Sequence, residues 1–176
     1  MSLEDFDLTG FWEESPYATK HFVDEPVTPA LLEKVERTLR YKLPAAYVEV
    51  MRHQNGGMPQ RTRHPMSERT SWSKDHISIT AIFAIGEKKP YSLLGEKGSR
   101  FWPSEWGYPR IGVYFANCPS GGHDMLCLDY RECGAAGEPR VVHIDQEFDY
   151  KVTFVAPNFE SFLRGLVIED AIDLDD

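Results

Sequence analysis

The spacing of apolar residues changes once along this chain, and that change constrains the fold more than any other feature of the sequence. Near the N-terminus, Thr28 can cap a helix and Pro29 suits the first helical position. Leu32, Val35 and Leu39 then follow at helical spacing and form one apolar stripe. In the second half of the chain, apolar residues recur with a period of two, which is typical of strands. The sequence therefore predicts helices first and a sheet afterwards.

The first third of the chain is predicted to be mainly helical. A short helix is expected over residues 8–14, broken by Ser15-Pro16. The helix that follows Thr28 is expected to end at Leu43-Pro44, where a third helix begins. Asn55-Gly56-Gly57 stops this third helix, because glycine reaches the left-handed cap conformation without a steric cost.

The remainder is predicted to form strands and a final helix. Strands are expected over residues 77–83, 111–115, 125–130, 140–145 and 151–155. The last four strands follow one another through short connections with glycine or acidic residues, which favours antiparallel pairing over helical crossovers. Asn158 is expected to cap the final helix.

Two segments have no clear period and are expected to be irregular. Residues 58–75 form a long basic loop, and residues 91–109 combine aromatic residues with Gly and Pro. Helices, an antiparallel sheet and a last helix together define an α+β domain. We expect its helices to cover one face of the sheet.

Length and composition indicate a single soluble domain. A chain of 176 residues can form one hydrophobic core, and it has neither a secretory signal nor an apolar run long enough to span a membrane. Cys118, Cys127 and Cys133 are too few for a disulfide scaffold, so we expect reduced thiols in the cytoplasm. The expected organisation is an acidic N-terminal extension over residues 1–27, an α+β domain over 28–167 and an acidic tail over 168–176.

The net charge of −9 bears on the kind of partner. An acidic chain argues against direct nucleic-acid binding through a broad cationic face. It suits a cationic partner, because opposite fields accelerate encounter, although the same charge can serve only to keep the protein soluble. Residues 52–74 depart from this trend, with five basic residues and one acid.

The sequence contains no recognisable metal-binding motif. The three cysteines are spaced too widely for a zinc knuckle. His123, Asp124, His143 and Asp145 fall near strand ends and could converge, but no HxH or HExxH pattern supports them. We therefore expect polar residues of turns and of the sheet surface, with no metal and no cofactor.

The candidates for a catalytic nucleophile are equally weak. Cys127 stands between Leu126 and Leu128 in a predicted strand, where a buried thiol is unreactive. Nothing beside Cys133 would lower its pKa, and no GxSxG elbow occurs. No catalytic residue is assigned, and the chain is not expected to be an enzyme. A cryptic hydrolase using His123, Asp124, His143 or Cys133 is the alternative.

Aromatic and basic residues supply the better candidates for a binding surface. Trp, Tyr and Arg dominate the energetics of protein interfaces. If the two predicted loops meet, they form a basic and aromatic patch; alternatively, the tryptophans cover the core beneath a long loop. The partner-binding candidates are Arg61, Arg63, Trp72, Trp102, Trp106 and Tyr108.

An ordered set of motifs extends over most of the chain. These are Leu43-Pro44 with Tyr47, Asn55-Gly56-Gly57, Gly86, Gly121-Gly122-His123-Asp124, the LCLDY of residues 126–130, the EPRVVHID of residues 138–145, and Phe159, Phe162 and Leu163. In this order they resemble the SUKH superfamily, which includes fungal cell-wall-assembly regulators of the Smi/Knr type and many bacterial proteins. The resemblance covers roughly residues 28–167.

The resemblance implies an α+β fold and a protein-binding role without catalytic residues. Bacterial members are regarded as immunity proteins that neutralise polymorphic toxins, often nucleases, by covering the toxin's active site. Fungal members act as signalling scaffolds. We therefore expect a bacterial immunity protein that binds a toxin domain, with a regulatory adaptor for a cellular protein as the alternative. The basic 52–74 segment does not fit simple nucleic-acid mimicry. No membrane partner is expected, and the sequence does not specify an oligomeric state.

Overall fold

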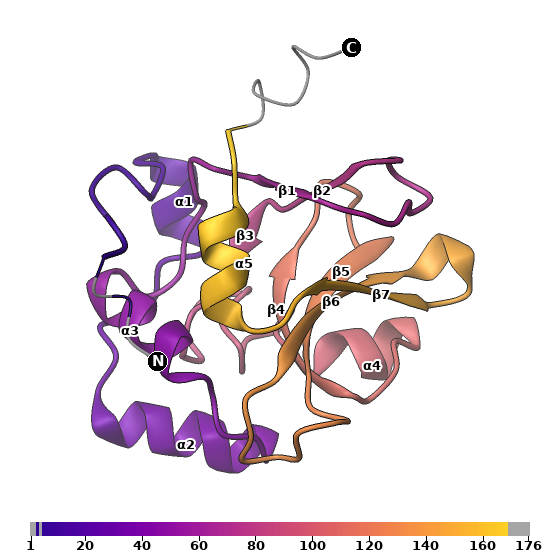
Figure 1. The fold of residues 1–176 in the computed structure, drawn as a ribbon. Helices are drawn as coiled ribbons and strands as arrows, with labels where there is room; N and C mark the ends of the chain where they lie inside the picture. Colours follow the sequence, from indigo (N-terminus) through magenta and orange to yellow (C-terminus); the bar gives the residue numbers. More distant parts are fainter. Residues whose placement is uncertain (1–2, 4, 169–176) are drawn as a thin grey trace.

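A computed structural model describes residue 3 and residues 5–168 (Figure 1). Within these residues, an antiparallel sheet of five strands runs in the order β3-β4-β5-β6-β7. The strands are β3 (Ala81–Ile82), β4 (Gly112–Asn117), β5 (Asp124–Asp129), β6 (Arg140–Asp145) and β7 (Lys151–Ala156). β4 to β7 confirm the four strands expected at the C-terminal end of the sequence. The α+β class is confirmed as well.

The N-terminal helices are α1 (Pro16–His21), α2 (Pro29–Leu39) and α3 (Ala45–His53). Thr28 caps α2 as expected, its hydroxyl accepting from the backbone nitrogen of Leu31 at 3.1 Å. The helix expected over residues 8–14 is wrong. Ser15 instead caps α1, with Pro16 at its first position, so this Ser-Pro pair begins a helix rather than breaking one.

The segment that links α3 to the sheet depends on Asn55 and Gly56. The Asn55 side chain donates to the Ile85 carbonyl at 2.8 Å and accepts from the Ile85 nitrogen at 2.8 Å. Gly56 has φ +88°, and a Cβ there would lie 2.4 Å from the Phe22 carbonyl oxygen. The expected stop after α3 therefore also joins the helical part of the chain to the sheet.

Both segments expected to be irregular contain short regular elements. β1 (Arg63–Pro65) pairs with β2 (His76–Ser78), so residues 63–78 form a hairpin, called the β1–β2 hairpin below. The strand expected over 77–83 is thus divided between two sheets. The segment 91–109 contains α4 (Phe101–Trp106), which ends at Gly107 with φ +77°. Three-residue strands and a six-residue helix are too short to leave a periodic signal.

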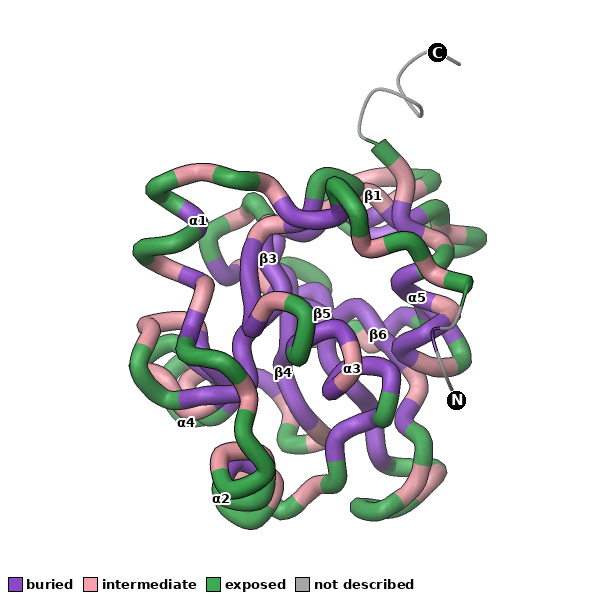
Figure 2. Tube along the Cα trace, turned by 90° about the vertical axis from the view of Figure 1, so that its left-hand side faces the viewer, coloured by how far each residue is buried: buried purple, intermediate pink, exposed green. Residues whose placement is uncertain are grey.

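Helical segments cover both faces of the main sheet, not one as expected. Tyr114 and Phe115 are neighbours in β4, at a point where the register with β5 shifts, and their rings make contacts with different elements. Phe115 packs against rings of α3 and of α5 (Phe159–Gly165), whereas the Tyr114 ring packs against Tyr108, which follows α4. Figure 2 places α4 on one side of β4 and β5, and α3 with α5 on the other. All six residues of β5 are buried as a result.

The N-terminal segment belongs to the same packed structure. Phe11, Trp12 and Phe22 are buried, and Trp12 bridges to Pro59. The expected acidic tail lies almost wholly outside the described residues. In the described part of the chain, no helix combines the length and apolar character needed to cross a membrane.

Candidate functional site

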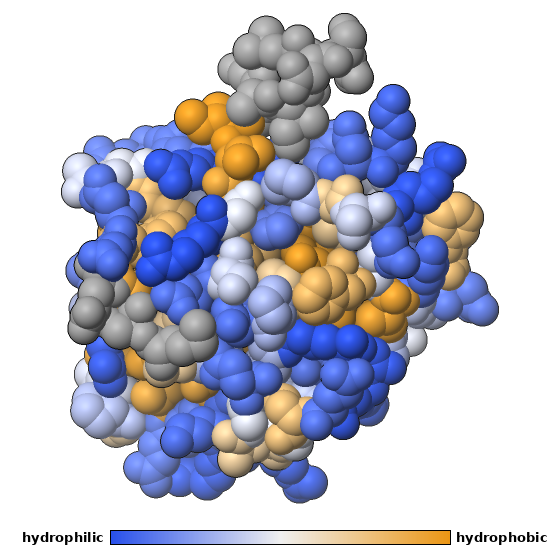
Figure 3. Space-filling model, viewed as in Figure 1, coloured by the Kyte–Doolittle hydropathy of each residue, from blue (hydrophilic) through white to orange (hydrophobic). Residues whose placement is uncertain are grey.

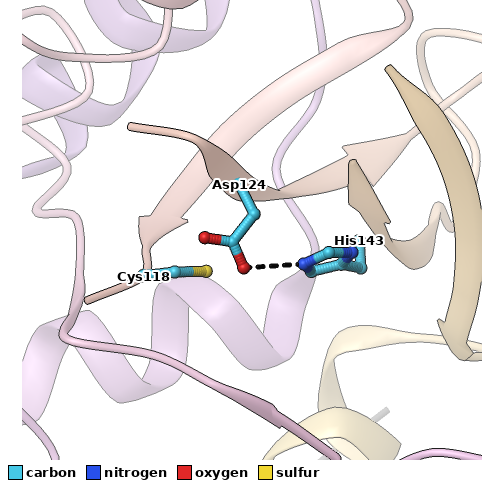
Figure 4. A group of neighbouring side chains, drawn as sticks. All are labelled: Cys118, Asp124 and His143. Atoms are coloured by element: carbon cyan, nitrogen blue, oxygen red, sulfur yellow. Dashed lines mark hydrogen bonds and ion pairs between the residues drawn. The ribbon is translucent and has the colours of Figure 1, made fainter. Parts of the chain in front are cut away.

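The clearest concentration of chemically active side chains lies where β4, β5 and β6 meet. Cys118 follows β4, Asp124 begins β5 and His143 lies within β6. Their possible ligand atoms all lie within 4.8 Å of one another, and all three side chains are buried. Figure 4 shows the sulfur of Cys118 directed towards the Asp124 carboxylate, which is bonded to His143 on its other side. We call these three residues the Asp124 cluster.

The carboxylate of Asp124 is held from several directions. Its Oδ2 lies 2.8 Å from Nε2 of His143, and its Oδ1 accepts from the Ser120 hydroxyl. The Ser120 oxygen also accepts from the backbone nitrogens of His123 and Asp124, at 3.0 and 3.1 Å. The residues 118–124, called the 118–124 turn below, thus present Asp124 in one fixed orientation.

His143 is completely buried, and one of its ring nitrogens lacks a partner. Its Nδ1 forms no hydrogen bond. Thr153 of β7 lies directly opposite His143 in the sheet, is 1% exposed, and also has an unpartnered hydroxyl. Buried polar atoms are seldom left unpaired, so this pair requires an explanation.

The order of the three side chains does not suit thiol catalysis. A nucleophilic cysteine needs a base beside its sulfur. Here the carboxylate stands between the thiol and the imidazole. Burial, together with the Asp124 carboxylate, raises the pKa of the Cys118 thiol well above its usual value. Burial also raises the pKa values of Cys127 and Cys133, and all three cysteines are free thiols.

A second carboxylate lies opposite the first. Asp145 pairs with Asp124 in the β5–β6 register and is 1% exposed. It accepts from the backbone nitrogen of Ser71 at 2.8 Å and from the Ser71 hydroxyl at 2.7 Å. These bonds tie the β1–β2 hairpin across the end of the sheet.

A cavity of about 240 Å³ lies between the hairpin and the 118–124 turn. Trp72, His76 and Ile77 line it from the hairpin, and Ser120 and Asp124 line it from the turn. The cavity therefore reaches the carboxylate of the Asp124 cluster from the solvent side.

The aromatic candidates take different positions from one another. Trp102 and Tyr108 are buried, at 4% and 2% exposure, Trp106 is half-buried, and Trp72 is 48% exposed. The Tyr108 hydroxyl donates to the Gly122 carbonyl at 2.6 Å, and the Trp106 ring packs edge-on against His123. Trp102, Trp106 and Tyr108 thus support the 118–124 turn from behind, whereas Trp72 faces the same turn across the cavity.

The two arginine candidates lie on or beside the hairpin. Arg61 is exposed just before β1, and Arg63 is half-buried within β1. Trp72, in the loop between β1 and β2, is the aromatic candidate that lies on the same hairpin as Arg63.

Sequence reasoning missed two groups of residues. Asp124 and His143 were expected to be separate polar residues of turns and of the sheet surface; instead they are buried and bonded to each other. Phe148 and Phe154 are 54% and 49% exposed, and Figure 3 shows hydrophobic side chains gathered over β7 and the residues before it. In β7 the polar Thr153 is buried and the apolar Phe154 is exposed, the reverse of what their polarity suggests, so the sequence contained no signal for either.

One family model matches most of the chain. The model is SUKH_6, described as SMI1-KNR4 cell-wall, and it covers residues 29–163. The chain belongs to the SUKH family. No curated protein matches the sequence. The SUKH match begins at Pro29 of α2 and ends within α5, so it includes the whole five-stranded sheet and the Asp124 cluster.

Proposed function

We propose that this SUKH protein is a non-enzymatic binding module of the immunity type, which neutralises a toxin domain by direct contact. Family membership supports a protein-binding role. The observation that carries the proposal is Trp72, a large aromatic side chain that is 48% exposed at the rim of a cavity. Exposed tryptophans beside concave surfaces are typical anchors of protein interfaces.

The loop that holds Trp72 is ordered before any partner arrives. The Thr70 hydroxyl accepts from the backbone nitrogen of Trp72 at 3.2 Å, and Thr70 itself is buried. Ser71 is fixed to Asp145 by two hydrogen bonds. A pre-ordered loop loses little conformational entropy on binding, which favours affinity.

The charges around Trp72 define the chemistry of the partner surface. The exposed basic residues on or near the hairpin are Arg61, Arg69 and Lys74, and they outnumber the exposed acids Glu68 and Asp75. The chain as a whole, by contrast, carries a net charge of −9. We infer that the partner offers an apolar pocket for Trp72 with acidic groups around it. The negative remainder of the molecule would accelerate encounter with a toxin whose other surfaces are cationic.

Growth rescue and binding kinetics test this proposal together. Co-expression with the toxin domain encoded beside this chain should restore growth, and Trp72→Ala should raise the dissociation rate of the complex at least tenfold. Tyr17→Ala is the matched control, because Tyr17 is also exposed but lies in α1, outside the family match. Absence of rescue by the native chain would contradict the toxin-binding function. Equal dissociation rates for the native chain and Trp72→Ala would show that Trp72 does not belong to the interface.

A regulatory adaptor is the second candidate, because the description of the matching family refers to the cell wall. An adaptor would bind a cellular protein with the same surface and would not rescue growth from a toxin. Purified cell-wall-assembly proteins tested by the same kinetic measurement distinguish the two candidates. Trp72→Ala would then weaken binding to the cellular partner alone.

A further inference from the structure

The Asp124 cluster combines three kinds of atom that bind transition metals. A sulfur, a carboxylate oxygen and an imidazole nitrogen lie within 4.8 Å of one another and come from three neighbouring segments of the sheet. Thiolate, carboxylate and imidazole are the ligands that Zn²⁺ takes in proteins. We propose that Cys118, Asp124 and His143 form a Zn²⁺ site that joins β4, β5 and β6.

The charge balance at this end of the sheet favours a cation. Asp124 and Asp145 lie directly opposite each other and are 4% and 1% exposed. Like charges in such positions destabilise a sheet. Their hydrogen-bond partners among the described residues are the Ser71 backbone nitrogen, the hydroxyls of Ser71 and Ser120, the Cys118 thiol and the His143 imidazole, and none of these bears a permanent positive charge. Lys151 lies opposite Asp145 in the β6–β7 register, but its side chain is exposed. A bound dication compensates for the Asp124 carboxylate and the Cys118 thiolate.

The unpaired atoms of His143 and Thr153 fit the same site. When Nε2 of His143 binds a metal, the ring proton resides on Nδ1. Metal-binding histidines nearly always donate this proton to a nearby acceptor. The Thr153 hydroxyl belongs to the residue directly across the sheet and is buried. This hydroxyl and Nδ1 of His143 do not bond each other in the structure, so Thr153 would have to rotate its side chain on metal binding to accept that proton. Thr153 is thus a positioning residue and not a ligand.

Metal binding would require the ligand atoms, which now lie within 4.8 Å of one another, to shift by about 1 Å. Zinc bonds of about 2.0–2.3 Å in tetrahedral geometry separate the ligand atoms by about 3.3–3.8 Å. Asp124 Oδ2 and His143 Nε2 are 2.8 Å apart. The distance between them would increase by about 1 Å or less when the metal replaces their hydrogen bond. The Cys118 thiol releases its proton to solvent on binding. The cavity is lined by Asp124 and not by Cys118 or His143, so the ion and a water molecule as fourth ligand would enter the cluster from the Asp124 side.

Metal binding by the full-length chain tests the proposal without any partner, so its outcome is independent of the toxin-binding function. After treatment with a chelator, calorimetric titration with ZnCl₂ should show one ion bound per chain. The melting temperature should rise by about 5 °C or more when free Zn²⁺ exceeds Kd 100-fold. Replacement by Co²⁺ should give the absorption band of a thiolate–cobalt bond in the native chain. Failure to bind stoichiometrically, or a cobalt spectrum without the thiolate band, would overturn the site.

Variants separate the proposed ligands from nearby groups of the same kind. Cys118→Ser should weaken Zn²⁺ binding at least about 100-fold and abolish the thiolate band. Cys133→Ser and His123→Gln are matched controls and should bind Zn²⁺ as the native chain does. If Cys118→Ser binds as tightly as Cys133→Ser, the assignment is wrong.

The role of Thr153 has its own test. Thr153→Val should weaken Zn²⁺ binding about tenfold while the thiolate–cobalt band remains, because a group that orients a ligand has been lost and the ligand itself has not. Thr153→Ser keeps the hydroxyl and should restore the affinity. Equal Zn²⁺ affinity of Thr153→Val and the native chain would remove Thr153 from the site.

Discussion

The two ends of the β5–β6 pair are built from similar residues and are balanced in opposite ways. At one end, Asp129 lies opposite Arg140 and is bonded to the guanidinium groups of both Arg131 and Arg140, at 2.9–3.0 Å. At the other end, Asp124 lies opposite Asp145. Burial alone would raise the pKa of Asp129, but the hydrogen bonds from Arg131 and Arg140 outweigh it, and the pKa lies below its usual value.

The comparison distinguishes a structural carboxylate from a functional one. Asp129 is compensated by permanent charges within the chain, so it needs nothing from outside. Asp124 relies on one hydroxyl, a thiol and an imidazole, and it lines a cavity. Asp124 is a buried carboxylate without a permanent counter-charge from the described residues. A cationic ligand gains the most binding free energy at such a group.

The largest expected effect concerns the aromatic support behind the Asp124 end. Trp102 is buried against Gly122, where a Cβ would lie 2.8 Å from the Trp102 ring. Trp102→Ala should lower the free energy of unfolding by about 3–5 kcal/mol, because it opens a cavity behind the 118–124 turn. Trp72→Ala, at an exposed tryptophan, should change it by less than about 0.5 kcal/mol. Urea denaturation measures the free energy of unfolding of both variants. Equal losses of stability would show that Trp102 does not support the fold more than Trp72 does.

The next effect tests the two ends directly. Asp129→Asn should destabilise the protein by about 3 kcal/mol, because Arg131 and Arg140 lose the buried carboxylate that they share. Among the described residues, only Arg140 keeps a second carboxylate, that of Glu132. Asp124→Asn, in metal-free protein, should cost about 1 kcal/mol, because an amide oxygen still accepts from His143 and the repulsion with Asp145 is relieved. Chemical denaturation in the presence of a chelator makes the measurement. If Asp124→Asn lost more stability than Asp129→Asn, Asp124 and not Asp129 would be the structural carboxylate.

The smallest effect concerns His64, a buried imidazole in β1, outside the β5–β6 pair. His64 stacks on Phe162 and its Nδ1 donates to the Pro65 carbonyl at 2.8 Å. Burial lowers the pKa of His64 below its usual 6.5. The unfolded chain therefore binds a proton more readily, and stability falls as the pH drops below about 6.5, by no more than about 1.4 kcal/mol per pH unit.

The variant His64→Gln isolates this contribution. Its unfolding free energy should depend less on pH between about 6.5 and 5 than that of the native chain. Denaturation at a series of pH values, with the difference taken between the two proteins, removes the effects of the other titrating groups. An unchanged pH dependence would show that His64 is protonated equally in both states.

Long, strongly patterned elements were predictable. Thr28-Pro29 and Asn158 mark helix starts, and β4 to β7 alternate or run apolar over six residues each. β1 and α4 were not predictable, because so few residues leave no period and their stability comes from packing against neighbours. The Ser15-Pro16 pair shows a further limit of locating helix ends from sequence, because the same two residues can end one helix or begin the next.

The sequence by itself determined the α+β class, the antiparallel pairing of the last four strands and the likeness to the SUKH family, because these depend on local patterns along the chain. Only the tertiary structure decided which polar residues meet. Cys118, Asp124 and His143 are separated along the chain, and the register between β5 and β6 is what brings a carboxylate of one strand beside an imidazole of the next. Register follows from the packing of both sheet faces as a whole, and no short stretch of sequence contains that information.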